Sequence, residues 1–300
     1  MGRAIYVSSV NGDDANSGYA PEKAFRSLKK VNQMEIQPGD QILLERGSVF
    51  VGEYLHLYRG GTKEAPVVVD AYGEGALPRI ETDGNGIWYQ NYGGHLDNVV
   101  HTWKGYLSSA VLLYDAEYIS IRNLEITNNP CVKNERLNQA DRMNRTGVSV
   151  IAKNHGTLHE IELDHLYIHD VEGNIYDKHL NNGGIYMSVS RPDDEEKTGI
   201  ARYDGIHIHH CKVENCRRWG IAAGYTYQHD KFTTLELPDE VVKTYGSTNV
   251  VIEHNFVKDI GGDGITPMYC FEPLIQYNVS ENIAVDIHPD LYNEEETVAV

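Results

Sequence analysis

The chain has 300 residues, and its 26 lysines and arginines against 44 aspartates and glutamates give a net charge of −18 with histidine neutral. This length suits one soluble globular domain, or two at most. So acidic a surface repels phosphate backbones and anionic lipids, which argues against nucleic-acid or membrane binding. No apolar run approaches the roughly 20 residues that span a bilayer, and the opening residues lack the apolar core of a signal peptide.

In chain order, the first predicted element is a helix over residues 23–34, where Phe25, Leu28 and Val31 recur at helical spacing. Before it, residues 11–18 (NGDDANSG) carry oxygens of the kind that bind calcium. They lack an EF-hand pattern, so we interpret them as an ordinary loop. The four cysteines, at 131, 211, 216 and 270, have no metal-finger spacing and are expected to be buried thiols.

From residue 118 onward, five segments superimpose without gaps, each alternating apolar and other residues and ending in Asn or Asp. Each has an apolar reference residue at the same place: Ile121, Leu163, Ile208, Ile252 and Ile275. These references are 42, 45, 44 and 23 residues apart. The shortest interval suits one coil of three short strands. We therefore predict that the five references stack in one inward-facing line.

Two further columns repeat with these segments. Seven positions after each reference stands a predicted turn residue: Asn128, Asp170, Asn215, Asp259 or Asn282. In four coils a glycine followed by an apolar residue opens another strand, at Gly147, Gly184, Gly220 and Gly264. The excess length falls in polar stretches at 130–145, 191–202 and 227–247, which are predicted to be protruding loops.

The opening sequence YVSSVNGDDANSGYAPEKAFRSLKKVNQM, the strand segment IQPGDQILLERGSVF and the GGDGI at 261–265 resemble the right-handed parallel β-helix carbohydrate-active enzymes. This is the superfamily of pectate lyases and polygalacturonases, and the likeness is nearest to bacterial β-helix glycoside hydrolases. It implies an all-β right-handed parallel β-helix, with residues 1–60 as a helix-bearing cap and first coil and residues 61–300 as the solenoid. It also implies an exported bacterial protein with an oligo- or polysaccharide substrate, no required cofactor and calcium as an option.

Residues 297–300 read as the start of another strand with no cap after it. Solenoids normally cover their last coil. We expect either a truncated chain or a second chain that completes this end of the solenoid.

The candidate chemistry lies on aspartates. Asp263 precedes the Gly264 strand opening, and the same five-residue offset from Asn282 places Asp286 in register on the next coil. Two carboxylates about 5 Å apart cannot both ionise easily, so one would stay protonated as an acid beside an ionised partner. Asp290 is the substitute for Asp286. The alternative is that Asp263 is a turn residue and the acids after it belong to a solvated loop.

Aromatic side chains follow the strand openings and are predicted to line a sugar-binding groove beside Asp263. They are Trp219, Tyr225, Tyr227 and Tyr269, with Tyr186 on the neighbouring strand. Ordinary aromatic stacking along the sheets is the competing interpretation. Arg217 would bind an acidic sugar or hold a turn.

The strand at 206–210 alternates so that Ile206 and Ile208 face inward while His207 and His209 face outward. Two histidines at this spacing can ligate zinc, but no third ligand is identifiable from the sequence. We predict a solvated strand and no metal site.

Three functions remain. We favour a glycoside hydrolase that uses Asp263 and a second carboxylate. A polysaccharide lyase acting on uronate glycans needs clustered cations or calcium, and this acidic chain has few. A non-catalytic glycan-binding solenoid would keep the aromatic groove without paired acids.

Overall fold

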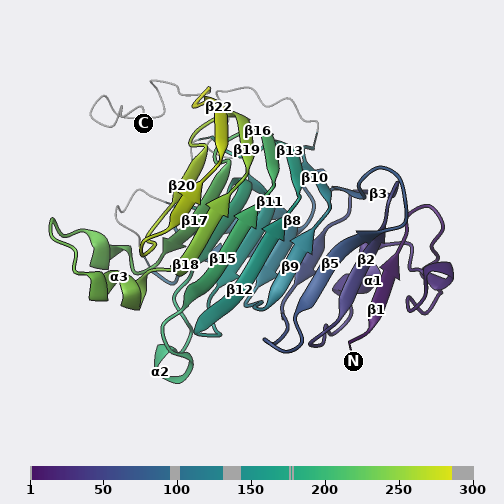
Figure 1. The fold of residues 1–300 in the computed structure, drawn as a ribbon, viewed down its shortest axis with the longest axis horizontal. Helices are drawn as coiled ribbons and strands as arrows, with labels where there is room; N and C mark the ends of the chain where they lie inside the picture. The colour runs from purple at the N-terminus through teal and green to yellow at the C-terminus, as the bar shows by residue number, and fades with distance from the viewer. Residues whose placement is uncertain (1, 95–101, 131–142, 176, 178, 286–300) are drawn as a thin grey trace.

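Three parallel β-sheets account for most of the regular structure in the computed structural model, which describes residues 2–94, 102–130, 143–175, 177 and 179–285 (Figure 1). The first sheet contains β1 (Ala4–Val7), β2 (Gln41–Glu45), β5 (Val67–Tyr72), β9 (Ile119–Arg122), β12 (Thr157–Asp164), β15 (Arg202–His209), β18 (Thr248–Glu253) and β21 (Leu274–Gln276). The second contains β3 (Val49–Val51), β6 (Arg79–Glu81), β10 (Glu125–Asn128), β13 (Tyr167–Val171), β16 (Lys212–Cys216), β19 (Phe256–Ile260) and β22 (Val279–Ile283).

The third sheet contains β4 (Leu55–Leu57), β8 (Lys104–Tyr114), β11 (Asn144–Ala152), β14 (Gly183–Val189), β17 (Ile221–Thr226) and β20 (Ile265–Pro267), with β7 (Ile87–Asn91) antiparallel to β8. The chain visits the sheets in a fixed order, as in β9, β10 and β11, and then starts again one strand further along each sheet. This path explains why the sequence repeats while every neighbouring strand in a sheet comes from a different repeat. The all-β part of the fold prediction is confirmed.

The predicted line of reference residues is confirmed by the strand register. Ile121 pairs with Leu163, Leu163 with Ile208, Ile208 with Ile252, and Ile252 with Ile275. The first four side chains are fully buried, whereas Ile275 is 39% exposed. Similar apolar columns run along the inner faces of the other two sheets, and together they form one core between the sheets.

Beside this core, an amide replaces the apolar side chain at the turn into β19. Asn255 is buried; its Oδ1 accepts from the backbone N–H of Cys211 at 2.9 Å, and its Nδ2 donates to the carbonyl of Ile208 at 2.9 Å. Asn278 repeats this pattern on the next turn of chain, accepting from the Asn255 N–H and donating to the Ile252 carbonyl. The amides thus satisfy backbone groups that the turn leaves unpaired.

The glycine column has a steric cause. A Cβ on Gly220 would lie 2.4 Å from the Gly264 carbonyl oxygen and 2.6 Å from Val257 Cγ1, and one on Gly184 would lie 2.6 Å from the Gly220 oxygen. Successive turns of chain therefore approach too closely for any side chain at this column.

One local prediction is confirmed in part and another is wrong. The predicted helix is present as α1 (Leu28–Asn32), but it does not extend back to residue 23, because the short 3-10 helix η1 (Pro21–Lys23) ends there and Phe25 forms a bridge with Val7. Asn128 does not join the turn column. It pairs with Val171 because the register shifts there, and its buried side chain bonds to Ser108 and to the Thr146 carbonyl.

The other members of the turn column adopt the left-handed backbone that Asn and Asp tolerate, with φ between 50° and 53°. The insertion at 191–202 contains α2 (Glu195–Thr198), and that at 227–247 contains η3 (His229–Phe232) and α3 (Asp239–Tyr245). Residues 131–142 of the remaining insertion, with Cys131, lie outside the described residues. Of the described thiols, Cys211 and Cys216 are buried and Cys270 is partly so, and all three are free. No described helix has the length and apolar character needed to cross a membrane.

Candidate active site

The candidate site lies at the corner where the chain passes from the second sheet to the third. Three connections meet there, formed by residues 172–182, 217–220 and 261–264. They come from adjacent turns of chain: the Gly184 N–H donates to the Trp219 carbonyl at 2.8 Å, and the Gly220 N–H donates to the Asp263 carbonyl at 2.9 Å. Side chains on these connections are therefore fixed relative to one another by the sheets on either side.

Asp263 and Arg218 form the charged part of this corner. Asp263 has a 38% exposed side chain, and its Oδ2 lies 3.8 Å from Nη2 of Arg218, whose side chain is buried. Gly262 permits this approach, because a Cβ there would lie 2.4 Å from Nη1 of Arg218. The guanidinium also lies 4.7 Å over the ring of Trp219. Asp263 is thus a solvent-accessible carboxylate beside a buried cation.

The second carboxylate at this corner is Asp177. Burial raises the pKa of its carboxyl above the ordinary value, although the N–H groups of His179 and Leu180 donate to Oδ1 at 3.0 and 3.2 Å and the charge of Arg218 acts in the opposite direction. A carboxyl whose pKa is raised and an exposed carboxylate, both near one guanidinium, are the two kinds of group that acid-assisted glycosidic cleavage uses.

The sequence pattern missed Asp177. It lies in the connection between β13 and β14, which has eleven residues where the next two repeats have four (217–220 and 261–264), so no column marks it. The extra length of this connection is the signal that could have pointed to it, because Asp170 lies 14 residues before Gly184 whereas Asn215 lies five before Gly220.

Aromatic rings form one wall of the corner. Tyr225 contacts three other rings edge-on: Tyr269 and Tyr92 with centroids 5.6 Å away, and His179 at 5.3 Å. Trp219 is 7% exposed, and within the described part of the chain its indole N–H has no hydrogen-bond partner. A buried donor without a protein acceptor is a candidate to bind a ligand hydroxyl.

Three predicted binding residues are placed differently from expectation. Tyr186 is completely buried and supports the wall from behind, with its ring 6.0 Å from that of Trp219, so it cannot contact a sugar in this structure. The hydroxyl of Tyr227 donates to Glu195 of α2 at 2.7 Å. Arg217 pairs with Glu172 at 3.1 Å, which supports the turn-holding interpretation. The predicted carboxylates Asp286 and Asp290 lie outside the described residues.

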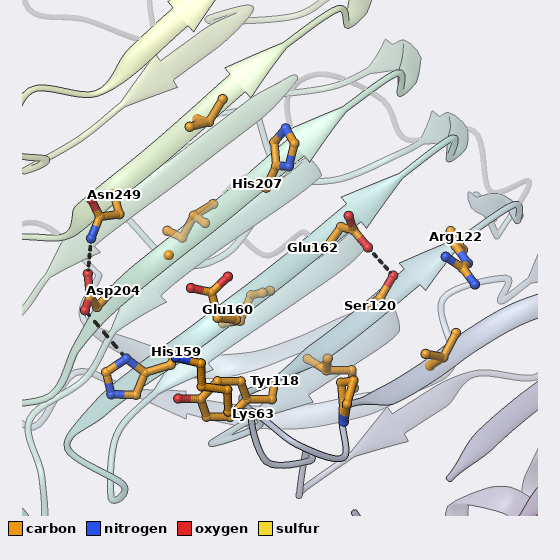
Figure 2. Close-up of a pocket in the computed structure, with 17 residues that line it drawn as sticks. Lys63, Tyr118, Ser120, Arg122, His159, Glu160, Glu162, Asp204, His207 and Asn249 are labelled. Atoms are coloured by element: carbon orange, nitrogen blue, oxygen red, sulfur yellow. Dashed lines mark hydrogen bonds and ion pairs between the residues drawn. The ribbon is translucent and has the colours of Figure 1, made fainter. Parts of the chain in front are cut away.

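A groove lies elsewhere, on the outer face of the first sheet (Figure 2). This groove of about 960 Å³ is lined by Glu162, Asp204, His159 and others. Burial would raise the pKa values of Glu162 and Asp204, but hydrogen bonds to Glu162 from Ser120 and His209, and to Asp204 from Thr248 and Asn249, lower both. Carboxylates held ionised in this way do not supply a proton donor, so the corner with Asp177 is the better candidate for acid catalysis.

Comparison with known proteins points to glycoside hydrolases. No protein-family model matches the chain. It is 39% identical over 329 aligned residues to a lacto-N-biosidase of Bifidobacterium longum subsp. longum, an alignment that covers 98% of this chain and 20% of the relative. It also matches two crystal structures of the GH136 lacto-N-biosidase of Eubacterium ramulus at 53% identity. The TM-scores are 0.94 for the selenomethionine derivative and 0.93 for the native protein, covering 99% and 98% of this chain.

The chain spans one fifth of the Bifidobacterium protein and about half (48%) of the Eubacterium chains. The matches nonetheless cover 98–99% of this chain.

Proposed function

We propose that this chain is the glycan-cleaving β-helix portion of a lacto-N-biosidase-type glycoside hydrolase. The likeness to named lacto-N-biosidases supports the reaction class, and the presence of Asp177 and Asp263 near the same guanidinium, that of Arg218, is the observation that carries the chemistry. The repeated order of strands through three parallel sheets supports a right-handed parallel β-helix, with residues 1–60 as its cap and first coil and residues 61–300 as the solenoid.

In the proposed reaction the protonated Asp177 carboxyl gives its proton to the leaving oxygen as the glycosidic C–O bond breaks. The Asp263 carboxylate faces the positive charge that develops on the sugar ring and either attacks the anomeric carbon or removes a proton from the attacking water. Arg218 places a positive charge beside the Asp263 carboxylate, where it can stabilise negative charge during the reaction. Oligosaccharide is the only partner that this chemistry requires.

The test is release of lacto-N-biose from an aryl lacto-N-bioside and from an oligosaccharide that ends in this unit. Both the disaccharide and any unsaturated uronate product are measured. Release of the disaccharide by the wild type, and its loss in Asp177→Asn and Asp263→Asn variants, would support the proposal. Activity that survives both substitutions would remove this corner from the mechanism.

The lyase alternative has less support. A lyase must neutralise a uronate carboxylate with free cations. At the candidate corner, Arg217 is paired with Glu172 and Arg218 lies beside Asp263. A uronate-specific product in the same assay would reverse this preference. We retain the proposal that a further segment or chain completes the C-terminal end, because β21 and β22 expose apolar side chains such as Leu274 and Val279.

A further inference from the structure

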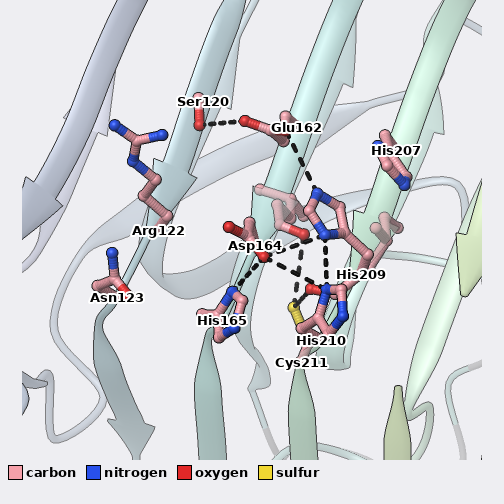
Figure 3. Close-up of polar contacts among 12 residues, drawn as sticks. Ser120, Arg122, Asn123, Glu162, Asp164, His165, His207, His209, His210 and Cys211 are labelled. Carbon is pink, nitrogen blue, oxygen red and sulfur yellow. Dashed lines mark hydrogen bonds and ion pairs between the residues drawn. The ribbon is translucent and has the colours of Figure 1, made fainter. Parts of the chain in front are cut away.

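The sequence pattern predicted no metal site, because His207 and His209 lacked a third ligand. The structure supplies other donors at the corner where the first sheet turns into the second (Figure 3). Asp164 ends β12, and His209 ends β15 on the next turn of chain. Each is followed by a histidine, His165 or His210, so four donor side chains from two neighbouring turns meet at one place.

Left-handed backbone brings these side chains together. His165 and His210 have φ values of 49° and 52°. Consecutive residues in a strand point to opposite faces, but the turn at His210 swings its ring back, so that its Nδ1 lies 2.9 Å from Nδ1 of His209. The His165 and His210 rings stack across the two turns with centroids 4.8 Å apart.

The donor atoms converge on one carboxylate oxygen. Oδ1 of Asp164 lies 2.5 Å from Nδ1 of His165, 3.0 Å from Nδ1 of His209 and 3.8 Å from Nδ1 of His210. A tetrahedral shell with bonds of roughly 2.0–2.1 Å has edges of about 3.3 Å, so small rotations of the side chains would fit such a shell.

We propose that Asp164, His165, His209 and His210 bind one late first-row divalent transition cation, with zinc as the representative ion. Three imidazole nitrogens and one carboxylate oxygen match the preference of zinc, nickel and copper, and they are a poor set for calcium or magnesium.

The surroundings orient the central ligand. With Nδ1 of His209 on the cation, its Nε2–H faces Oε1 of Glu162 at 3.3 Å, and Glu162 Oε2 accepts from the Ser120 hydroxyl at 2.6 Å. A carboxylate that holds the second nitrogen of a ligating histidine fixes the tautomer and the ring orientation. Glu162 is therefore a positioning residue for this site.

The bound cation would be structural rather than catalytic. Four protein ligands leave no open position for a substrate. The ligands join two turns of chain, and β13 lies between this corner and the connection that holds Asp177. Loss of the cation is therefore expected to lower thermal stability without changing glycoside hydrolysis, so this inference stands or fails independently of the proposed function.

The test uses tag-free, chelator-stripped protein and competition for Zn²⁺ against a chromophoric chelator. We expect one ion per chain with an affinity in the micromolar range or tighter, and a Tm rise of about 5 °C at a hundredfold excess over Kd. The double variant His165→Ala/His210→Ala should lose more than a hundredfold in affinity. Both side chains are about half exposed, so the variant should fold, which its metal-free Tm will show.

Two further variants make the test specific. Glu162→Gln should weaken binding by about tenfold, the size expected when the orienting partner of a ligand is lost. His207→Ala is the matched control, since its ring stacks on that of His209 at 3.9 Å but belongs to the other possible set with Glu162. It should bind zinc within twofold of wild type. The assignment would be overturned if the wild type bound no zinc at a 100-fold molar excess of Zn²⁺ without chelator. It would also be overturned if His207→Ala lost zinc binding while the double variant still bound zinc.

Discussion

Nη2 of Arg218 lies 3.8 Å from Oδ2 of Asp263, and the charge of the same guanidinium acts on the carboxyl of Asp177. One buried cation thus serves two carboxyl groups in unequal environments. Asp177 is held by burial and by N–H donors, whereas Asp263 is open to solvent. Unequal environments are what separate the acid from the base in two-carboxyl hydrolases.

Asp263→Asn should lower kcat on a lacto-N-bioside by at least about a thousandfold, because the amide can neither attack carbon nor accept a proton. Its Tm should stay close to that of wild type, since the side chain is partly exposed. Asp259→Asn is the control: this carboxylate lies four residues earlier, accepts from Asn282 at 2.5 Å, and should leave kcat unchanged. Full activity in Asp263→Asn would exclude the residue from the mechanism.

Asp177 should give the reaction its alkaline limit. A proton donor must be protonated, so kcat/KM should fall as pH rises through the raised pKa of Asp177, and Asp177→Asn should abolish turnover at every pH.

The same shift makes a prediction for stability. Because the folded pKa of Asp177 lies above the unfolded value of roughly 3.9, the proton favours the folded state below that value, and this contribution is lost as pH rises through the folded pKa. Asp177→Asn should therefore match wild type in urea unfolding at acid pH and exceed it near pH 7. The opposite order would show that Asp177 is ionised and favourably paired in the folded protein.

Trp219→Phe should lower kcat/KM by about three- to tenfold without loss of stability, because it removes an indole N–H that makes no bond to the described part of the protein. Trp88→Phe is the contrasting variant. Its Nε1 donates to the Ser109 hydroxyl at 2.8 Å, so this change should destabilise the fold and leave kinetics alone. Urea unfolding of the two variants reports the effect on packing, and their steady-state kinetics report the effect on substrate binding.

Asn255→Ala should reduce the free energy of unfolding by about 2–4 kcal/mol, because it leaves the Cys211 N–H and the Ile208 carbonyl buried without partners. Asn154→Ala removes an exposed amide that bonds to Asp193 and should change it by no more than about 0.5 kcal/mol. Equal effects in urea denaturation would contradict a structural role for the buried amide.

Gly220→Ala should destabilise the protein by at least about 3 kcal/mol, because the new methyl group meets backbone oxygen at 2.4 Å. Gly94→Ala is the matched substitution, with its nearest neighbour Arg191 Nη2 at 3.9 Å and no left-handed backbone. Thermal unfolding of the two variants separates the steric cost of the added methyl group from the change in backbone entropy that any Gly→Ala substitution brings.

The repeat pattern carried most of the information that the sequence alone could provide. The line from Ile121 to Ile275 was predictable because burial imposes the same requirement on every turn of chain. Asn128 was mispredicted because a register shift moved its partner from Asp170 to Val171, and such shifts leave no periodic trace. Asp177 was missed because its significance comes from its tertiary surroundings, and it lies in extra residues that the equivalent connections at 217–220 and 261–264 do not have.

The cluster of Asp164, His165, His209 and His210 was missed for a related reason. Periodicity identified His207 and His209 as outward-facing residues. This is confirmed by the burial of Ile206 and Ile208, which alternate with them along the strand. It could not show that the left-handed turn at His210 folds that ring back toward Asp164, since two adjacent histidines in a regular strand would point apart.

The residues that stack along the sheets and the residues that form the candidate site lie in different parts of each turn of chain. Residues that set the register, such as Ile208 and Gly220, lie in the paired strands or directly before them, while the connection holding Asp177 leaves the sheets at a corner. Lengthening or replacing that connection would alter the surface of the candidate site while the strand register of the sheets stays in place. Exchange of this connection is therefore expected to change which glycan fits at the corner without unfolding the sheets.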